Sequence, residues 1–356
     1  MIAPGPVYPA WVDASVAGFG AALPGHGRSQ QELWDGYFAG RAESRAEERL
    51  FLNAGVTRRH TVVDPTAEDV SGWSTGQRMR RYAVEALPLG KEAVTAALGD
   101  AGLDPGDVGL FAVASCTGYA TPGLDIRVAA DLGMAPDVQR LLVGHMGCYA
   151  ALPALGAAAD HVTSRGRPAV LLCLELTSLH VQPPGGGRDQ LVSHALFGDA
   201  ASAVVLRPGR AGLQVLDVAA RTDPTTADHM TWDVTDLGFR MGLSPAVPGV
   251  LARHVRDVVH TLLERHGLTT ADVDAWAVHP GGPRILDVVA DQLDLPDDAL
   301  DASRQVLAEC GNCSSATVLL VLEELRARGR PRPGRAAVAL AFGPGLTLYA
   351  ALLRGT

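Results

Sequence analysis

The sequence has a single lysine, an excess of negative charge and no long apolar run. Lys91 is the only lysine among 356 residues, so any anionic ligand has to be held by arginine, histidine or backbone amides. The net charge of −9 argues against a nucleic-acid partner. No apolar run reaches the roughly 18 residues of a membrane span, and the N-terminus lacks the basic-then-apolar pattern of a signal peptide. These absences predict a cytoplasmic protein with neither a membrane nor a nucleic-acid partner.

Cysteines are few, and their number and setting exclude two common roles. The five cysteines are odd in number and lie in apolar stretches, which argues against a disulfide framework. Cys310 and Cys313 form a CxxC pair, but no second cysteine or histidine pair stands at the spacing of zinc ligands, so we expect no metal site. With 47% hydrophobic and 19% charged residues, the chain has the composition of a soluble globular protein, long enough for two fused units.

One cysteine stands in a setting that suits a nucleophile. Residues 141–162, LLVGHMGCYAALPALGAAADHV, read as the end of a buried strand, a tight glycine passage and an Ala-rich helix that Cys148 opens. A thiol at a helix N-terminus feels the positive end of the helix dipole, which favours the thiolate. A buried structural cysteine explains this stretch equally well, so other parts of the chain must decide.

Two parts of the chain repeat the same order of elements. A helix end, an acidic turn, an apolar strand and a glycine loop follow one another in GDAGLDPGDVGLFAVASCTG and again in ERHGLTTADVDAWAVHPGG. In each part a further glycine and a polar residue then open a helix. The spacing agrees, because 45 residues separate Gly102 from Gly147 and 44 separate Gly267 from Gly311. The sequence therefore contains an internal duplication.

The duplication predicts two βα halves, residues 1–210 and 211–356, packed about a pseudo-twofold axis. Strand–helix alternation with apolar strands predicts an α/β fold with mostly parallel sheets covered by helices. Cys148 and Asn312 occupy equivalent places in the two halves, each at a helix N-terminus, and His279 lies just past the strand AWAV. The three residues can therefore converge at the interface between the halves.

Five segments carry a resemblance to a known family: MGCYAAL, LFGDAASAVVL, VHPGGPRILD, CGNCSSATVLLVLEEL and AFGPGLTLYAALL. Together they resemble the type III polyketide synthase (chalcone synthase-like) family of the thiolase superfamily, from about Gly55 to the end of the chain. HPGG at 279–282 replaces the HQAN of ketoacyl synthase III relatives. The resemblance implies a homodimer with a thiolase-like fold, in which two pseudo-duplicated βα halves form a layered αβαβα core.

The resemblance also implies a catalytic triad of Cys148, His279 and Asn312. The Cys148 thiolate, stabilised by His279 as an imidazolium, would take the acyl group of an acyl-CoA starter. Asn312 and His279 would donate hydrogen bonds to the thioester oxygen of malonyl-CoA and stabilise the enolate left by decarboxylation. Claisen condensation, repetition and cyclisation would then give a pyrone or a small phenolic product. Coenzyme A thioesters are the substrates, and neither a cofactor nor a metal is implied.

Further residues fall at pocket positions of the family: the gatekeepers Phe197 and Met241, and Glu175, Thr177, His180, Trp232, Ser314, Gly343 and Gly345. Methionine replaces the second gatekeeper phenylalanine of the plant enzymes, and a core methionine explains this position almost equally well. Trp232 falls where plant chalcone synthases have glycine, although a surface-exposed tryptophan is an equal alternative. Bulky side chains here should shrink the cavity or redirect it elsewhere. We expect few extensions and a triketide or tetraketide product.

Two remaining assignments concern ligand phosphates and the dimer interface. Arg58 and Arg59 lie where the family places basic residues near the CoA phosphates, and guanidinium groups bind phosphate in a bidentate manner. A solvated turn explains this basic cluster equally well. Thr121 matches a position that reaches across the dimer interface in the family.

Three other functions stay open from the sequence alone. The first is a ketoacyl synthase III-like enzyme that performs one condensation with an acyl carrier protein. The second is a non-catalytic acyl-CoA-binding protein. The third is a cysteine hydrolase, which is disfavoured because Asn312 opens a helix aimed at the pocket rather than orienting the histidine.

Overall fold

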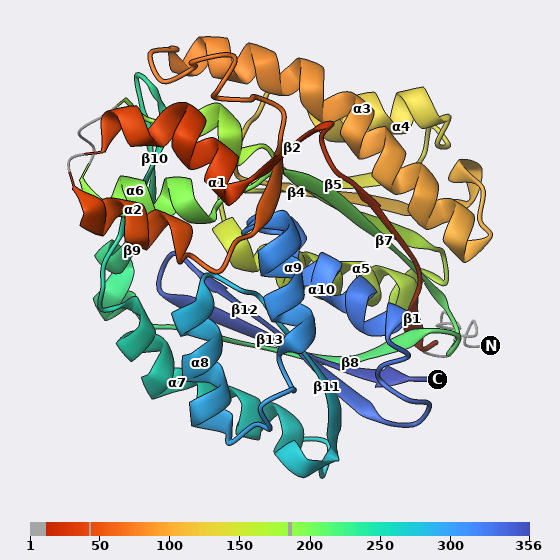
Figure 1. The fold of residues 1–356 in the computed structure, drawn as a ribbon. Coiled ribbons are helices and arrows are strands. Elements are labelled where there is room, and N and C mark those ends of the chain that lie inside the picture. Colours follow the sequence, from red (N-terminus) through yellow and green to blue (C-terminus); the bar gives the residue numbers. More distant parts are fainter. Residues whose placement is uncertain (1–11, 43, 184–186) are drawn as a thin grey trace, which may run out of the picture.

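The computed structural model describes residues 12–42, 44–183 and 187–356, and within them the centre of the fold is one sheet of nine strands (Figure 1). The strand order is β11-β12-β13-β8-β1-β7-β6-β4-β5. The strands span β1 Ala14–Ala22, β4 Leu110–Ser115, β5 Gln139–Gly144, β6 Ala169–Glu175, β7 Ala200–Pro208, β8 Leu213–Thr222, β11 Val273–Val278, β12 Ala336–Gly343 and β13 Thr347–Gly355.

The sheet contains the same strand order twice. One half runs β1-β7-β6-β4-β5 and the other runs β8-β13-β12-β11. The pairs also match in direction, since β1–β7 and β8–β13 are antiparallel whereas β6–β4 and β12–β11 are parallel. The halves join where the equivalent strands β1 and β8 pair through Ser15 with Gln214 and Val16 with Leu213. The internal duplication is therefore a property of the fold, in which β5 alone has no counterpart among the described residues.

The expectation of mostly parallel sheets is wrong, because the large sheet is mixed. Within it, only β4–β5, β4–β6 and β11–β12 are parallel among the strand pairs of the described residues. The reason is clearest at β12 and β13, which are joined by residues 344–346. A connection this short allows only an antiparallel pair, since a parallel pair needs a crossover of about a dozen residues or more.

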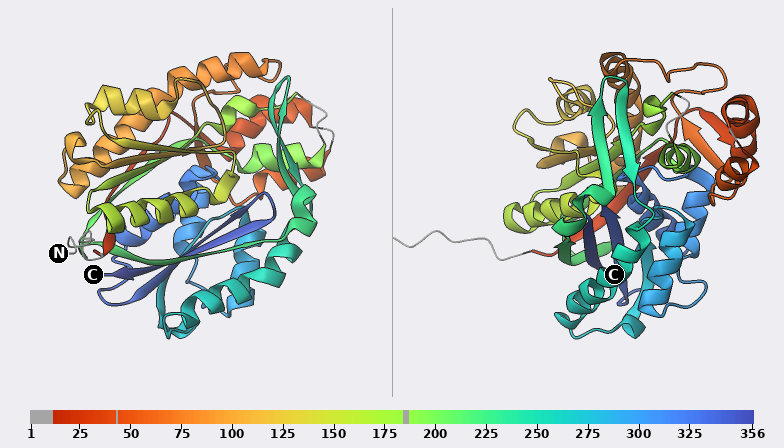
Figure 2. Two further views of the ribbon diagram at one scale, coloured as in Figure 1. Left: turned by 180° about the vertical axis from the view of Figure 1, so that it is seen from behind. Right: turned by 90° about the vertical axis from the view of Figure 1, so that its left-hand side faces the viewer.

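Helices separate and cover the two halves of the sheet in five layers (Figure 2). The central layer contains α5 Ala151–Arg165 and α10 Ala316–Ala327, whose side chains share one buried cluster with strands of both halves. One outer face is covered by α3 Thr75–Ala101 and α4 Leu124–Leu132, and the other by α7 Val247–Glu264 and α8 Pro283–Leu293. This is the layered αβαβα core expected from the resemblance.

Glycines in β1 allow α3 to lie directly on the sheet. A Cβ atom on Gly18 would stand 2.3 Å from the carbonyl oxygen of Ala97, and one on Gly20 would stand 2.4 Å from that of Ala93. These distances are below any real contact, so both positions require glycine. The long helix, which begins after the capping Ser74, is thereby fixed against the strand that joins the two halves.

A set of shorter elements lies beside one edge of the core, at the left of Figure 1. It comprises β2 His26–Ser29, α1 Gln30–Leu33, α2 Arg45–Leu52, β3 Arg58–Thr61, α6 Arg188–Leu196, β9 Met230–Thr235 and β10 Gly238–Leu243. Ser29 caps α1 through a reciprocal bond with Glu32, and the chain continues as a π-helical turn over Trp34–Phe38. Among the described helices, none has both the length and the apolar character needed to cross a membrane.

Candidate active site

Cys148 lies between β5 and α5, in a tight backbone passage. Residues 147–149 form a single 3₁₀ turn directly before α5. Gly147 has a φ of 77°, and a Cβ atom there would lie 2.8 Å from the Pro344 side chain. Only glycine fits this passage. The turn places the Cys148 thiol at the N-terminal end of α5, where the sequence pattern put it.

The glycine loop between β12 and β13 packs against the same turn. A Cβ atom on Gly343 would lie 2.9 Å from the Tyr149 ring and 3.4 Å from the amide nitrogen of Cys148. Gly345 has a φ of 132°, which side chains other than glycine rarely adopt. Tyr149 in turn stacks on Tyr349 of β13, with ring centroids 5.4 Å apart. The loop therefore fixes the backbone around the thiol.

The His279 ring has no hydrogen-bond partner among the described residues, whereas the Asn312 side chain is oriented by one hydrogen bond to its own loop. His279 follows β11, and its amide donates to the carbonyl of Leu340 at 2.8 Å. Its ring is fully buried, and neither ring nitrogen has a hydrogen-bond partner among the described residues. Asn312 Oδ1 accepts from the amide of Ser314 at 2.9 Å. This contact fixes the orientation of the amide group and directs its NH2 group away from Ser314.

Cys148, His279 and Asn312 line one cavity of about 380 Å³. They come from three elements far apart in the sequence: the β5–α5 turn, the end of β11 and the segment before α10. A volume of this size is typical of a small-ligand site. The convergence expected from the duplication is present in the structure.

Burial dominates the electrostatics of the thiol and the imidazole. It raises the pKa of the Cys148 thiol to about 12, although hydrogen bonds from Ser314 and Asn312 lower that pKa. It also lowers the pKa of the His279 imidazole to about 3. At neutral pH the substrate-free site therefore contains a neutral thiol and a neutral imidazole. Burial therefore opposes the thiolate that the helix dipole favours.

Glu175 is fully buried in a dense hydrogen-bond network and lines none of the pockets named here, although the sequence analysis placed it in the substrate pocket. Its carboxylate accepts from the amide of Cys116 at 3.0 Å, from Thr117 Oγ1 at 2.8 Å and from Ser315 Oγ at 2.6 Å. Burial raises the pKa of this carboxyl, while these donors lower it. Cys116 Sγ lies 3.4 Å from both Glu175 Oε1 and Ser314 Oγ. The network thus links the buried acid to Ser314, which lines a recess together with Cys148.

Cys116 is a pocket residue that the sequence analysis did not single out. It lines a recess of about 20 Å³ together with Cys148, Trp232 and Ser314. Its position could have been inferred from the duplication, because it follows β4 as His279 follows the equivalent strand β11. The residue after each of these strands therefore faces the site.

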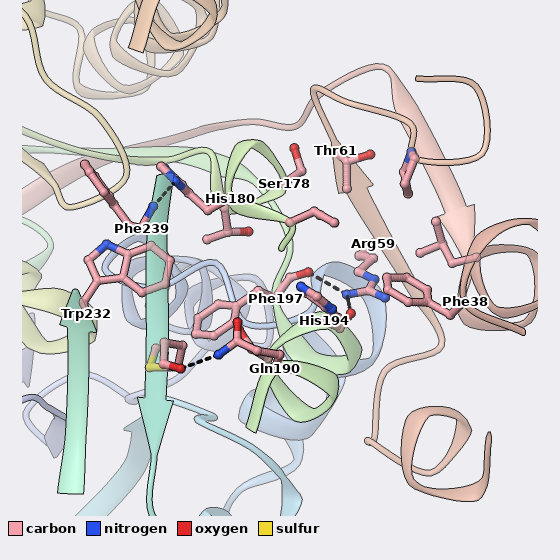
Figure 3. Close-up of a pocket in the computed structure, with 16 residues that line it drawn as sticks. Phe38, Arg59, Thr61, Ser178, His180, Gln190, His194, Phe197, Trp232 and Phe239 are labelled. Atoms are coloured by element: carbon pink, nitrogen blue, oxygen red, sulfur yellow. Dashed lines mark hydrogen bonds between the residues drawn. The ribbon is translucent and has the colours of Figure 1, made fainter. Parts of the chain in front are cut away.

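His180, Trp232 and Phe239 line a separate pocket of about 40 Å³ (Figure 3), and of the three only Trp232 also lines the recess next to Cys148. The His180 ring stacks on Phe239 at 4.5 Å, donates to the carbonyl of Thr117 at 2.6 Å and accepts from the amide of Phe239 at 2.9 Å. Trp232 is half-buried, and its Nε1 donates to the carbonyl of Cys116 at 2.7 Å. Both side chains fasten the β9–β10 hairpin to the loop after β4. The alternative of a surface-exposed tryptophan does not hold.

Phe197 and Met241 lie where the cavity that contains Cys148, His279 and Asn312 meets two smaller pockets. Both residues line the cavity of about 380 Å³, the recess of about 20 Å³ next to Cys148, and a third pocket of about 40 Å³ (Figure 3). The carbonyl of Met241 accepts from Gln190 Nε2 at 2.5 Å. Thr177, another expected pocket residue, donates from its hydroxyl to the carbonyl of Gly198 at 2.9 Å and so fastens the chain next to Phe197.

The two arginines expected at the CoA phosphates differ in their surroundings. Arg58 is exposed. Arg59 is 3% exposed, and its Nη1 donates to the carbonyls of His194 and Phe197, so a contact with phosphate does not fit its geometry. Arg188 and Arg284, by contrast, are exposed and line the cavity of about 380 Å³ that contains Cys148, His279 and Asn312. Sequence reasoning missed both, although Arg284 directly follows the HPGG motif and its proline.

The CxxC pair shows no metal-binding geometry. Cys313 is buried and its thiol donates to the carbonyl of Cys310 at 3.4 Å. In the described part of the chain, no three His, Cys, Asp or Glu side chains gather in a way that could hold a metal ion.

Comparison with known proteins places both halves of the chain in one family. Residues 10–209 match the N-terminal domain model of chalcone and stilbene synthases, and residues 215–356 match the C-terminal domain model. The chain is similar to a 1,3,6,8-tetrahydroxynaphthalene synthase of Streptomyces peucetius subsp. caesius, with 39% identity over 96% of this chain and 93% of that protein. It is also 31% identical to an alpha-pyrone synthesis polyketide synthase-like protein of Mycobacterium tuberculosis, over 84% of this chain and 80% of that protein.

Solved structures agree with the sequence relatives. The C-terminal type III polyketide synthase domain of Steely1, a type I/III hybrid from Dictyostelium, superposes with a TM-score of 0.91 at 26% identity, over 96% of this chain and 99% of that domain. The chain therefore belongs to the chalcone and stilbene synthase family and is a type III polyketide synthase, an acyltransferase of thiolase-like fold.

Proposed function

We propose that the chain loads an acyl-CoA starter on Cys148 and extends it with malonyl-CoA through His279 and Asn312. The observation that carries the proposal is that these three side chains open onto one cavity. The His279 ring nitrogens are free of partners within the described residues, so the imidazole can accept one proton and donate another to a ligand.

Loading begins with a proton transfer inside the buried site. The Cys148 proton passes to His279 as Sγ attacks the thioester carbon. The positive charge on the imidazole and the negative charge on the attacking group therefore form together and stabilise each other. A new Sγ–carbon bond forms, the bond between that carbon and the CoA sulfur breaks, and His279 returns the proton to the departing CoA thiolate. The neutral resting pair suits this sequence, because neither charge has to persist alone in a dry site.

Extension requires a stabilised enolate. Malonyl-CoA loses CO₂, and the electron pair of the broken bond moves into the thioester as an enolate. The Asn312 NH2 group and a protonated His279 nitrogen donate to the enolate oxygen. The enolate carbon then attacks the acyl group on Cys148, which expels the Cys148 thiolate and lengthens the chain by two carbons. Decarboxylation supplies the driving force, and the acyl chain can return to Cys148 for another cycle.

Intact-protein mass spectrometry tests the loading step. The wild-type protein incubated with acyl-CoA starters should gain the mass of one acyl group, and Cys148→Ala should gain none. Acylation that persists in Cys148→Ala would assign the nucleophile to another residue, with Cys116 as the nearest alternative.

Two exposed arginines at the cavity, Arg188 and Arg284, can bind the phosphates of coenzyme A. Arginine is needed for this role because the chain has a single lysine. Arg188 opens α6, and Arg284 lies in the first turn of α8. Both line the cavity that contains the catalytic residues. We assign to them the contact with CoA phosphates that the sequence analysis gave to Arg58 and Arg59.

The space behind Cys148 supports a short product. The recess bounded by Cys148, Trp232 and Met241 holds only about 20 Å³, and Trp232 is fixed by its bond to the carbonyl of Cys116. We therefore propose triketide or tetraketide products that cyclise to a pyrone or a small phenolic ring, from a starter small enough to share the main cavity.

Trp232→Gly is expected to shift the products toward longer chains by at least one ketide unit. Removal of the indole opens space of the order of 100 Å³ or more next to the acyl group, and an engineered cavity of about 150 Å³ already holds a benzene molecule. Trp232→Phe fills most of the space that the indole occupies but lacks the hydrogen bond from Nε1, so it serves as the matched control. Liquid chromatography–mass spectrometry of both reactions makes the comparison, and an unchanged chain length in Trp232→Gly contradicts the assignment of the indole to the pocket floor.

A second copy of this chain is proposed to pair along β5. This strand forms an edge of the sheet, and its residues Leu141 and Leu142 are 37% and 49% exposed. Unpaired apolar edges are normally covered. Thr121 is exposed in the loop before α4, and neighbouring residues of that loop line a hollow of about 330 Å³ with Leu142.

Light scattering should therefore give twice the mass of one chain. Leu142→Lys, which adds like charges across a twofold axis, should lower that mass to one chain. A monomeric wild-type protein would contradict the pairing.

A further inference from the structure

Arg59 is a buried cation whose guanidinium contacts backbone carbonyls rather than a carboxylate. Its Nη1 donates to the carbonyl of Phe197 at 2.7 Å and to that of His194 at 2.5 Å (Figure 3). Burial lowers the pKa of the guanidinium to about 10, and the nearby charge of Asp199 raises it. The group therefore stays protonated at neutral pH. A charged donor on a carbonyl is stronger than a neutral one, so this contact holds the Phe197 backbone firmly.

The segment that Arg59 holds is paired directly with the segment of Asn312. The amide of Asn312 donates to the carbonyl of Leu196 at 2.8 Å, and the amide of Gly198 donates to the carbonyl of Asn312 at 3.1 Å. These two bonds form a short parallel bridge between Phe197 and Asn312. Displacement of residues 196–198 would therefore move Asn312 as well.

The segment 196–198 packs closely against the backbone of residues 310–312. A Cβ atom on Gly198 would stand 2.3 Å from the carbonyl oxygen of Cys310 and 3.2 Å from Arg59 Cβ. A Cβ atom on Gly311 would stand 2.7 Å from the carbonyl oxygen of Leu196. Arg59 lies against both glycines, since its Cβ is also 3.6 Å from the position of the Gly311 Cβ. It thus packs at the junction as well as bonding to it.

We propose that Arg59 is a positioning residue that sets both Phe197 and Asn312 through the 196–198 backbone. The inference rests on the proposed function, in which Asn312 stabilises the enolate. Cys148 is fixed separately, by the packing of its turn against Pro344 and Gly343. Loss of Arg59 should therefore impair decarboxylation and chain-length control while sparing the nucleophile. This separation distinguishes positioning from a general contribution to folding.

The test compares Arg59→Gln, Arg59→Lys and the control Thr61→Val. Thr61 lies on the same strand, is buried and lines the same pocket of about 40 Å³, but its hydroxyl has no hydrogen-bond partner among the described residues. Each variant is measured for acylation of Cys148 by a starter, for CO₂ release from malonyl-CoA and for the distribution of product lengths. Thermal melting identifies variants that are not folded.

In Arg59→Gln we expect CO₂ release to fall about tenfold to 100-fold, as misplacement of a catalytic group does, with acylation within about twofold of wild type. Arg59→Lys keeps the buried charge and should release CO₂ faster than Arg59→Gln. If Arg59→Gln does not fold, CO₂ release and acylation are compared in Arg59→Lys instead. In an Asn312→Ala background, Arg59→Gln should lower CO₂ release no further. Equal losses of acylation and CO₂ release, or additive losses in the double variant, would overturn the inference. Wild-type protein that releases no CO₂ would refute the proposed function instead.

Discussion

Asn312→Ala is expected to lower the rate of malonyl-CoA decarboxylation by about 100-fold to 1000-fold, as the loss of one oxyanion donor does. The reason is geometric, because the Asn312 Oδ1 is engaged by the Ser314 amide and the NH2 group is the part left to meet the enolate. Acylation of Cys148 should change far less, since Asn312 contributes to the thiol only one of several hydrogen bonds.

Separate assays of the two half-reactions check this expectation. Release of CO₂ reports decarboxylation, and intact-protein mass spectrometry reports acylation. If acylation fell as steeply as decarboxylation, Asn312 would act on the nucleophile rather than on the enolate.

His279→Ala is expected to slow both half-reactions severely near neutral pH. The Cys148 thiol has a pKa of about 12, so without a proton acceptor only about one molecule in 10⁵ carries a thiolate at pH 7. Acylation should then increase about tenfold for each pH unit from about pH 7 to about pH 9, because the thiolate fraction rises tenfold per unit below the pKa. The wild-type rate should depend much less on pH over that range, since His279 supplies the acceptor.

The pH dependence of acylation in His279→Ala is the measurement, with the exposed His266→Ala as the matched control. A His279→Ala protein that acylates at the wild-type rate with a flat pH profile would show that Cys148 is already a thiolate at rest. The buried neutral pair would then be ruled out.

The architecture of the catalytic centre could be predicted from spacing because both halves use one plan. Gly147 and Gly311 each precede a site residue by one position, and each of those residues precedes a central helix. The two central helices then bring Cys148 and Asn312 together from opposite sides. No single motif shows that Cys148 and Asn312 occupy equivalent places, and only the comparison of the two repeats does.

Strand direction and protonation state could not be predicted, for physical reasons. Whether β12 and β13 run antiparallel depends on the length of one loop, which apolar patterning does not reveal. Whether Cys148 is a thiol or a thiolate depends on burial from all sides, which the sequence does not show.

Arg59 illustrates how sequence position can mislead. Adjacent arginines in a short strand point to opposite faces, and here Arg58 faces solvent whereas Arg59 is buried. The sequence placed both at the CoA phosphates, while strand alternation alone would have separated them. Arg188 and Arg284 reach the cavity from α6 and α8, two elements whose proximity only the fold reveals.

The most direct test of the central claim is mass spectrometric analysis of the products formed from malonyl-CoA and a panel of acyl-CoA starters. The account predicts products spaced by ketide units, of triketide or tetraketide length, that are absent with Cys148→Ala. Single-condensation products that require an acyl carrier protein, or turnover unaffected by Cys148→Ala, would contradict it.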